Sequence, residues 1–362
     1  MHNIYCDYLS CQFLEEDKGT NCCINLRTCT CQKKSYKDSC CLYVNTLMNY
    51  VTAEGGRPLG CKHFMKKKKL NTIIKNGISK EFIVATLIEI PREIFVNVED
   101  IDKSLANHSL PLIDGQTISQ PSLVGQMIQM LNLTELETKP DVKILEIGTA
   151  SGYNAVLLSE CLNKLDCKNN TVYTIELYSS LVHKAINNIL NLHKALPMPE
   201  ADRRYNIRSA SRPGGSGDPE RNDSAGAPPH RGAELRSGCI VKFETGKGNL
   251  VLYKGDGTKS LGFCYNRIIV TAGGDLPLTF IEDLDYNGIL VMPVDFPDLE
   301  AQYIVRFKKL KELKGDNVDD VDDLKSILNK KDFETKTIIF NGRYSLVINI
   351  GIPVTFVPLQ SL

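Results

Sequence analysis

The chain has 362 residues, and 43 lysines and arginines balance 43 aspartates and glutamates, so the formal net charge at pH 7 is zero. This balance provides no overall field to attract nucleic acid or a membrane surface. The longest apolar run, residues 344–359, is too short to span a bilayer and contains Asn349 and two prolines. We therefore expect neither a nucleic-acid partner nor a membrane partner.

Residues 1–64 contain nine of the 13 cysteines and show no helical or strand periodicity. No basic region followed by an apolar core marks a secretory signal, so the sequence favours a cytoplasmic protein, in which disulfides would not persist. The C-x-x-C pair typical of a zinc site is missing. We interpret residues 1–64 as a weakly ordered, Cys-rich N-terminal extension with free thiols; a metal site is the alternative.

The first periodic pattern begins near residue 70, with two short apolar helical faces separated at Asn76-Gly77 and ended by Pro91. A polar loop, residues 110–121, then precedes another predicted helix. One serine there could simply cap that helix, but this loop offers several hydroxyl and amide groups, more than a cap needs. These groups are the side chains of Gln116, Thr117, Ser119 and Gln120.

The centre of the chain predicts a buried strand over 142–147, a small-residue turn over 148–152 and a helix over 153–163. A strand that leads into a helix N-terminus is a ready ligand site. Ala150 stands where a dinucleotide motif needs its middle glycine, and the Glu146 carboxylate would repel a pyrophosphate. A cation such as S-adenosylmethionine fits this charge better. The alternative is a tight turn of no special function.

The strand–helix alternation continues and predicts a mostly parallel sheet. Glu176 follows the second strand, at a position suited to hydrogen bonds with ribose hydroxyls. The further strands are expected over 171–175, 249–253, 267–271, 289–293, 344–349 and 354–357, with helices over 180–196 and 278–284.

Two stretches interrupt the folded domain that we expect over residues 65–362. Residues 197–238 are rich in Arg, Pro, Gly, Ser and Ala and poor in large apolar residues, so we predict a disordered insertion. Residues 315–337 look like a smaller insertion. Its acidic run, 316–323, is similar to a calcium loop only in charge, because the glycine of an EF-hand is missing.

Several of these pieces together resemble the protein-L-isoaspartate O-methyltransferases. The G-Q-T-I-S-Q-P stretch is the most specific, whereas the G-T-x-S-G-Y turn is shared by many methyltransferases. The similar pieces are PREIFV (91–96), LPLIDGQTISQP (110–121), LEIGTASGY (145–153), RIIVTAG (267–273), ILVMPV (289–294) and TFVPL (355–359).

The resemblance implies a class I methyltransferase fold, a Rossmann-like α/β architecture with a mostly parallel central sheet and helices on both faces. It also implies an enzyme that moves a methyl group from S-adenosylmethionine to the free α-carboxylate of L-isoaspartyl residues in damaged proteins and peptides. The methyl ester collapses to a succinimide, which hydrolyses in part to normal aspartate. We expect a monomer whose partners are isoaspartyl proteins and peptides.

The resemblance assigns roles residue by residue. Ser119 matches the active-site serine, and we expect it to hydrogen-bond the substrate carboxylate and not to attack, because no G-x-S-x-G elbow surrounds it. No metal ligand is implied. The implied cofactor residues are Gln116 and Thr117 over the cofactor, Glu146, Gly148, Ser151 and Gly152 at its methionine end, Glu176 at the ribose, and Asp256 and Gly257 at the adenine.

Three departures from the family pattern, one of them the apparent insertion over residues 315–337, concern the substrate-side rim more than the cofactor site. Ala150 replaces a glycine, which we expect to be a mild change, and VDFPDLEAQYIV replaces a glycine-rich stretch after Pro293.

Two other functions stay open. A non-catalytic adaptor with a methyltransferase-like domain conflicts with the presence of Ser119 and the acidic residues. Another class I methyltransferase would act on a small molecule or, against the neutral charge, on nucleic acid.

Overall fold

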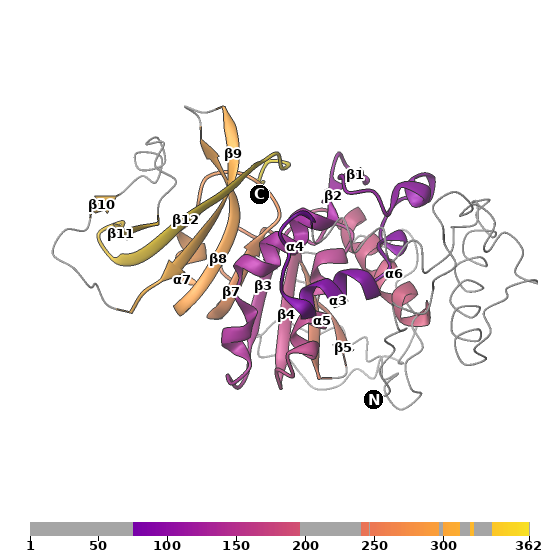
Figure 1. The fold of residues 1–362 in the computed structure, drawn as a ribbon, viewed down its shortest axis with the longest axis horizontal. Coiled ribbons are helices and arrows are strands. Elements are labelled where there is room, and N and C mark those ends of the chain that lie inside the picture. The colour runs from indigo at the N-terminus through magenta and orange to yellow at the C-terminus, as the bar shows by residue number, and fades with distance from the viewer. Residues whose placement is uncertain are drawn as a thin grey trace, which may run out of the picture. The chain divides into compact units, whose positions relative to one another are not determined.

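A ten-stranded sheet, in the order β10-β11-β12-β9-β8-β7-β3-β4-β6-β5, forms the centre of the part of the chain that the structure describes (Figure 1). The structure is a computed structural model that describes residues 75–195, 240–245, 247–296, 300–311, 319–321 and 335–361. The predicted extension over 1–64 and the predicted insertion over 197–238 lie outside these residues. The strands are β3 (Lys143–Ile147), β4 (Asn170–Glu176), β5 (Ile240–Thr245), β6 (Gly248–Lys254), β7 (Tyr265–Val270), β8 (Leu284–Phe296), β9 (Ala301–Lys309), β10 (Asp319–Val321), β11 (Lys336–Phe340) and β12 (Tyr344–Val354).

Five of the predicted strands are confirmed as the parallel core of the sheet. β3 pairs in parallel with β4 on one side and with β7 on the other, and the parallel pairing continues to β6 and to β8. The middle residues of these strands are mostly buried on both faces, which fits apolar runs such as Leu250–Leu252, Ile268–Val270 and Ile289–Met292. The carboxyl ends of β3, β4 and β7 therefore meet at one edge, where ligands bind in open α/β sheets.

Antiparallel strands extend this core on both sides, and sequence reasoning missed most of them. β5 pairs with β6, whereas β9 lies between β8 and β12, and β12 also pairs with β11. In Figure 1 the long strands β8, β9 and β12 form a twisted ribbon beside the helical part. The described parts of the expected insertion 315–337 hold β10 and the first residues of β11, which pair in parallel.

The predicted closing strand 344–349 is confirmed as part of a longer strand, whereas the prediction of a second strand over 354–357 is wrong. One strand, β12, runs from Tyr344 to Val354 and absorbs a register shift between Ile350 and Pro353. A Cβ on Gly351 would lie 3.0 Å from the Ile304 carbonyl oxygen, so this irregularity brings two backbones close together. The chain then leaves the sheet as a strap, residues 355–361, which touches it through an isolated bridge between Gly273 and Pro358.

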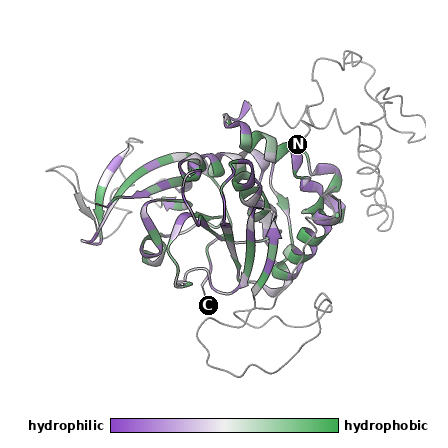
Figure 2. Ribbon diagram, turned by 90° about the horizontal axis from the view of Figure 1, so that it is seen from below, coloured by the Kyte–Doolittle hydropathy of each residue, from purple (hydrophilic) through white to green (hydrophobic). Residues whose placement is uncertain are grey.

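The helices begin and end largely where the sequence predicts. Pro91 follows α3, whose C-cap Ile90 is extended, as is usual before a proline. α5 and α6 pack on β4 and β6, α3 packs on α4 and α5, and α7 packs on β8. In Figure 2 the helices carry both hydrophobic and hydrophilic residues, as expected of helices that bury one face. The bounds are α3 (Glu81–Glu89), η1 (Arg92–Ile94), η2 (Val98–Lys103), α4 (Pro121–Met130), η3 (Leu133–Leu136), α5 (Tyr153–Lys164), α6 (Ser179–Ala195) and α7 (Leu278–Glu282).

The alternation of side chains along β3 sets the position of its acidic residue. Leu145 and Ile147 belong to the apolar cluster that includes Phe280 and Ile281 of α7. Glu146 points to the opposite face, where it meets α5. Within the described part of the chain, no helix is both long enough and apolar enough to cross a membrane.

Candidate active site

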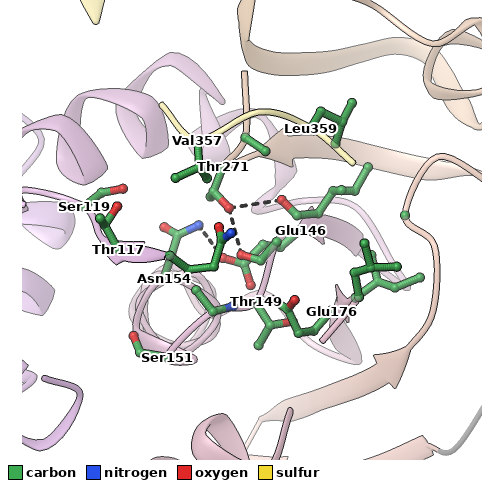
Figure 3. Close-up of a pocket in the computed structure, with 18 of the residues that line it drawn as sticks. Thr117, Ser119, Glu146, Thr149, Ser151, Asn154, Glu176, Thr271, Val357 and Leu359 are labelled. Carbon is green, nitrogen blue, oxygen red and sulfur yellow. Dashed lines mark hydrogen bonds between the residues drawn. The ribbon is translucent and has the colours of Figure 1, made fainter. Parts of the chain in front are cut away.

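A pocket opens at the carboxyl ends of β3, β4 and β7, where the parallel core ends (Figure 3). It is bounded by the turn after β3, by the loop that carries Ser119 and by the C-terminal strap. Among the sequence-predicted site residues, those that line it are Gln116, Thr117, Ser119, Glu146, Gly148, Ser151, Glu176 and Gly257.

The turn after β3 depends on its first glycine. Gly148 has φ +97°, and a Cβ there would lie 2.4 Å from the Thr271 Oγ1 atom. That hydroxyl donates to the Gly148 carbonyl oxygen at 2.7 Å and so ties the end of β7 to the turn. Ala150 also has positive φ, +49°. This conformation costs an L residue about 1–2 kcal/mol, so the replacement of glycine by Ala150 is less mild than we expected.

Glu146 is completely buried beneath the pocket and is hydrogen-bonded through both oxygens. Its Oε1 accepts from Asn154 Nδ2 at 2.7 Å and its Oε2 accepts from Thr174 Oγ1 at 2.5 Å. The Thr174 hydroxyl lies 2.6 Å from that of Thr149. Burial raises the pKa of Glu146 to about 8, against the opposing effect of these hydrogen bonds. The carboxyl is therefore mostly protonated at neutral pH until a cationic ligand favours its charged form.

Glu146→Gln is expected to flatten the dependence of folding stability on pH. The pKa of Glu146 is about 8 in the folded protein against 4.5 ordinarily. Folded protein thus holds the proton more tightly, and this stabilisation is complete below pH 4.5 and lost as pH rises to about 8. The free energy of unfolding of wild type should fall on the order of a few kcal/mol more than that of the variant across this range. Urea denaturation at several pH values measures the difference, and parallel curves would contradict it.

Glu176 joins the end of β4 to the turn after β3. Its side chain is buried, and its carboxylate accepts from the Ala150 backbone N–H at 2.8 Å and from the Tyr178 N–H at 3.0 Å. Burial raises the pKa of this carboxyl, while the backbone donors act in the opposite direction. The carboxylate is therefore fixed in orientation by backbone donors on both oxygens, and the Leu177 backbone N–H contributes as well.

The Ser119 loop forms the opposite side of the pocket. A short ladder of β1 (Leu110–Pro111) and β2 (Thr117–Ile118) precedes Ser119 directly. Figure 3 shows Ser119 and Thr117 on one side of the pocket and Glu176 on the other. The fold thus brings together side chains that are far apart in the sequence.

Two predicted site residues do not line the pocket. Gly152 is the N-cap of α5, and a Cβ there would lie 3.3 Å from Ala185 of α6, so its small size serves helix packing. Asp256 accepts from the Thr258 backbone N–H at 2.9 Å and from the Thr258 hydroxyl at 2.6 Å, which shapes the turn after β6. Its neighbour Gly257 does line the pocket.

Sequence reasoning missed the C-terminal strap as a wall of the pocket. Val357, Leu359 and Gln360 line it together with Pro358. The strap is held by two backbone hydrogen bonds with Gly273, one from the Gly273 N–H to Val357 at 2.8 Å and one from Leu359 to Gly273 at 2.7 Å. The Tyr178 hydroxyl also donates to Gln360 Oε1. The resemblance of TFVPL (355–359) to the family pointed to this segment, but the sequence predicted a strand there and not a wall of the pocket.

The charge of the lining distinguishes among ligands. The described residues that line the pocket include two carboxyl groups, Glu146 and Glu176, and no lysine, arginine or histidine. A pyrophosphate in this pocket would meet two acidic side chains and no cationic one. A ligand with a cationic ammonium and a cationic sulfonium, together with ribose hydroxyls, matches this set of acceptors.

Known proteins show the same combination of sequence and fold. The family model described as protein-L-isoaspartate (D-aspartate) O-methyltransferase matches residues 64–214 and 234–322. The protein-L-isoaspartate O-methyltransferase of Rhodospirillum rubrum is 30% identical over 241 residues, which are 66% of this chain and 80% of that protein. The one from Dictyoglomus thermophilum is 31% identical over 258 residues, 70% of this chain and 84% of its own length.

A solved structure supports the fold. A putative protein-L-isoaspartate O-methyltransferase from Plasmodium falciparum, in complex with S-adenosyl-L-homocysteine, aligns with a TM-score of 0.50 and 15% identity and covers 82% of this chain and 98% of that one. At this identity the likeness concerns the fold alone. The family match and the relatives, which agree over most of the folded part, show that this chain belongs to the protein-L-isoaspartate (D-aspartate) O-methyltransferase family.

Proposed function

We propose that this protein is a repair enzyme that methylates the free α-carboxylate of L-isoaspartyl residues in damaged proteins and peptides, with S-adenosylmethionine as the methyl donor. One observation carries the proposal beyond family membership. The hydroxyl of Ser119 and two buried carboxyl groups, Glu146 and Glu176, line a single pocket at the carboxyl edge of the sheet.

The residues around the pocket would hold the donor in an extended arrangement. Glu176 takes the ribose hydroxyls, and Gly257 lies at the adenine. Glu146, Gly148 and Ser151 would form the methionine end, where Gly152 contributes through helix packing, and Asp256 would contribute at the adenine end by shaping the turn that carries Gly257. Gln116 and Thr117 cover the donor from the loop side. When bound, S-adenosylmethionine supplies a methyl group on a positively charged sulfur.

Ser119 acts by orientation in this proposal. A carboxylate is already ionised at neutral pH, so the enzyme needs no strong general base. The Ser119 hydroxyl donates a hydrogen bond to the substrate carboxylate and holds it toward the donor. The strap residues Val357 and Leu359 add apolar side chains to the wall of the same pocket. Positioning of this kind can supply about 7–11 kcal/mol of the barrier reduction.

The decisive test compares two peptides that differ only in one linkage. Purified protein with S-adenosylmethionine labelled in the methyl group should label a peptide that contains L-isoaspartate and leave its aspartyl twin unlabelled. Equal labelling of both peptides would contradict the proposed specificity. Cofactor binding without labelling of either would identify a non-catalytic adaptor.

We further propose that the enzyme acts as a monomer in the cytoplasm and on proteins, not on nucleic acid. The zero formal net charge supports the choice of substrate, since a nucleic-acid enzyme would be expected to carry a basic surface. The structure describes one chain, and the monomeric state and the compartment stay predictions.

A further inference from the structure

Arg92 is a completely buried cation whose hydrogen bonds all go to backbone carbonyl oxygens. It is the first residue of η1, directly after Pro91, and its guanidinium reaches into the segment that leads to Ser119. The acceptors are the carbonyl oxygens of Ser104 at 2.8 Å, Ala106 at 3.4 Å, His108 at 3.0 Å, Ile118 at 3.4 Å and Ser119 at 3.1 Å.

Two of these contacts fix the backbone on both sides of Ser119. The Ile118 carbonyl belongs to the peptide unit before Ser119, and the Ser119 carbonyl belongs to the unit after it. One guanidinium nitrogen, Nη2, donates to both. Because a peptide unit is planar, holding both units restricts the two backbone dihedral angles of Ser119 and hence the direction of its side chain.

The charge of Arg92 is stabilised by these carbonyl dipoles and by the nearby Glu93 carboxylate, while its buried Nε atom makes no hydrogen bond within the described residues. Arg92 forms no ion pair with any residue that the structure describes, and burial lowers the pKa of its guanidinium. A planar fork of donors can reach several diverging carbonyl oxygens at once, whereas a lysine ammonium is a compact group with three donors. Lysine could keep the charge but not this set of contacts.

We propose that Arg92 is the positioning residue for Ser119: it clamps the Ser119 loop so that the serine hydroxyl faces the pocket. The inference rests on the proposed role of Ser119 in binding the substrate carboxylate. Arg92 itself does not line the pocket, so it acts through the loop and not on the reacting groups.

The chain offers a matched control in Arg267, a second buried arginine. Arg267 is 1% exposed and donates to the carbonyl oxygens of Leu131, Asn132 and Asn266 and to the Glu135 carboxylate. Burial lowers its pKa as well. Its contacts hold the C-terminal end of α4, and none of its acceptors lines the pocket. A substitution there removes a comparable clamp without touching Ser119.

The experiment compares Arg92→Lys with Arg267→Lys in the full chain. Both variants should melt at lower temperature than wild type. Arg92→Lys should lower kcat for an isoaspartyl peptide by about tenfold or more, because small misplacements in a site can cost about 100-fold. Its calorimetric Kd for S-adenosylhomocysteine should change much less than kcat, because Glu146 and Glu176 lie on other elements and only Gln116 and Thr117 share the loop with Ser119. Arg267→Lys should keep both kcat and Kd. Equal kcat losses in the two variants, or no loss in Arg92→Lys, would overturn the proposal.

A second measurement does not depend on catalysis or on the folding of the variant. In wild type, NMR order parameters of the Ser119 and Gln120 amides should be near the rigid-backbone value of about 0.85, and values below about 0.6 would overturn the clamp. If the wild type fails to methylate isoaspartyl peptides but these amides are rigid, the proposed function fails while the clamp stands. If Arg92→Lys folds, the same amides should become mobile, whereas Arg267→Lys should leave them rigid.

Discussion

Ser119→Ala is expected to lower kcat/KM for an isoaspartyl peptide by about 10- to 150-fold while leaving the affinity for S-adenosylhomocysteine unchanged. The factor follows from the loss of one hydrogen bond to a charged group, worth about 1.5–3 kcal/mol. The backbone around Ser119 should not move, since Arg92 holds the carbonyl groups of the loop and not the hydroxyl. Steady-state kinetics with the peptide, together with calorimetry, measures the two effects separately.

Ser122→Ala is the matched control. Ser122 lies at the start of α4, is 1% exposed and does not line the pocket. Its hydroxyl accepts from Gln120 Nε2 at 3.3 Å, so the substitution removes a buried serine hydroxyl close to the same loop. It should leave kcat/KM close to the wild-type value. A loss of cofactor affinity in Ser119→Ala would assign the hydroxyl to the donor, and unchanged kinetics would leave it without a role.

The parallel core could be predicted because strands that are buried on both faces contain runs of apolar residues that can be recognised in the sequence. The strands β3 and β7 are mostly buried, and each contains a short apolar run, Ile144-Leu145 and Ile268–Val270, just before its carboxyl end. Since the carboxyl ends of parallel strands share one edge, Glu146 and Glu176 had to lie near each other. The polar loop with Ser119 required the family resemblance, because nothing in the residues alone placed that loop over the edge.

The antiparallel extension was harder to predict because its strands are less apolar. β9 carries Arg306 and Lys308 among its hydrophobic residues. The end of β12 continues directly into the strap without a turn signal. The strap becomes a wall of the pocket through tertiary hydrogen bonds, such as those with Gly273, that the sequence does not reveal.

The protonation state of Glu146 could not be predicted from the sequence either. The motif indicates an acid at the end of β3, and we treated it as a fixed negative charge. Its pKa of about 8 comes from complete burial under α5, and Asn154 and Thr174, which accompany it, are brought there by the fold. The contacts of Arg92 could not be predicted from the sequence either. The PREIFV stretch served only as a marker of the family, and its arginine holds the Ser119 loop.

Glu176→Ala is expected to weaken S-adenosylhomocysteine binding by about 10- to 150-fold, from the loss of about 1.5–3 kcal/mol in hydrogen bonds between the carboxylate and the ribose. Both carboxylate oxygens already accept backbone N–H groups, those of Ala150 and Tyr178, and Leu177 contributes as well. The carboxylate is therefore oriented before the ligand arrives, and its remaining lone pairs are available at the pocket wall. Calorimetric titration with S-adenosylhomocysteine measures the effect.

Asp283→Ala separates this effect from a general loss of stability. Asp283 is a half-buried carboxylate at the C-cap of α7, its pKa is raised by burial, and it accepts from the Ser260 hydroxyl at 2.6 Å. It does not line the pocket, so its removal should lower the melting temperature without changing the Kd. Glu176→Gln keeps one acceptor oxygen and should bind with intermediate affinity. If Glu176→Ala bound S-adenosylhomocysteine as tightly as Asp283→Ala does, the acid at the end of β4 would serve only to hold the turn, and the ribose would have to lie elsewhere in the pocket.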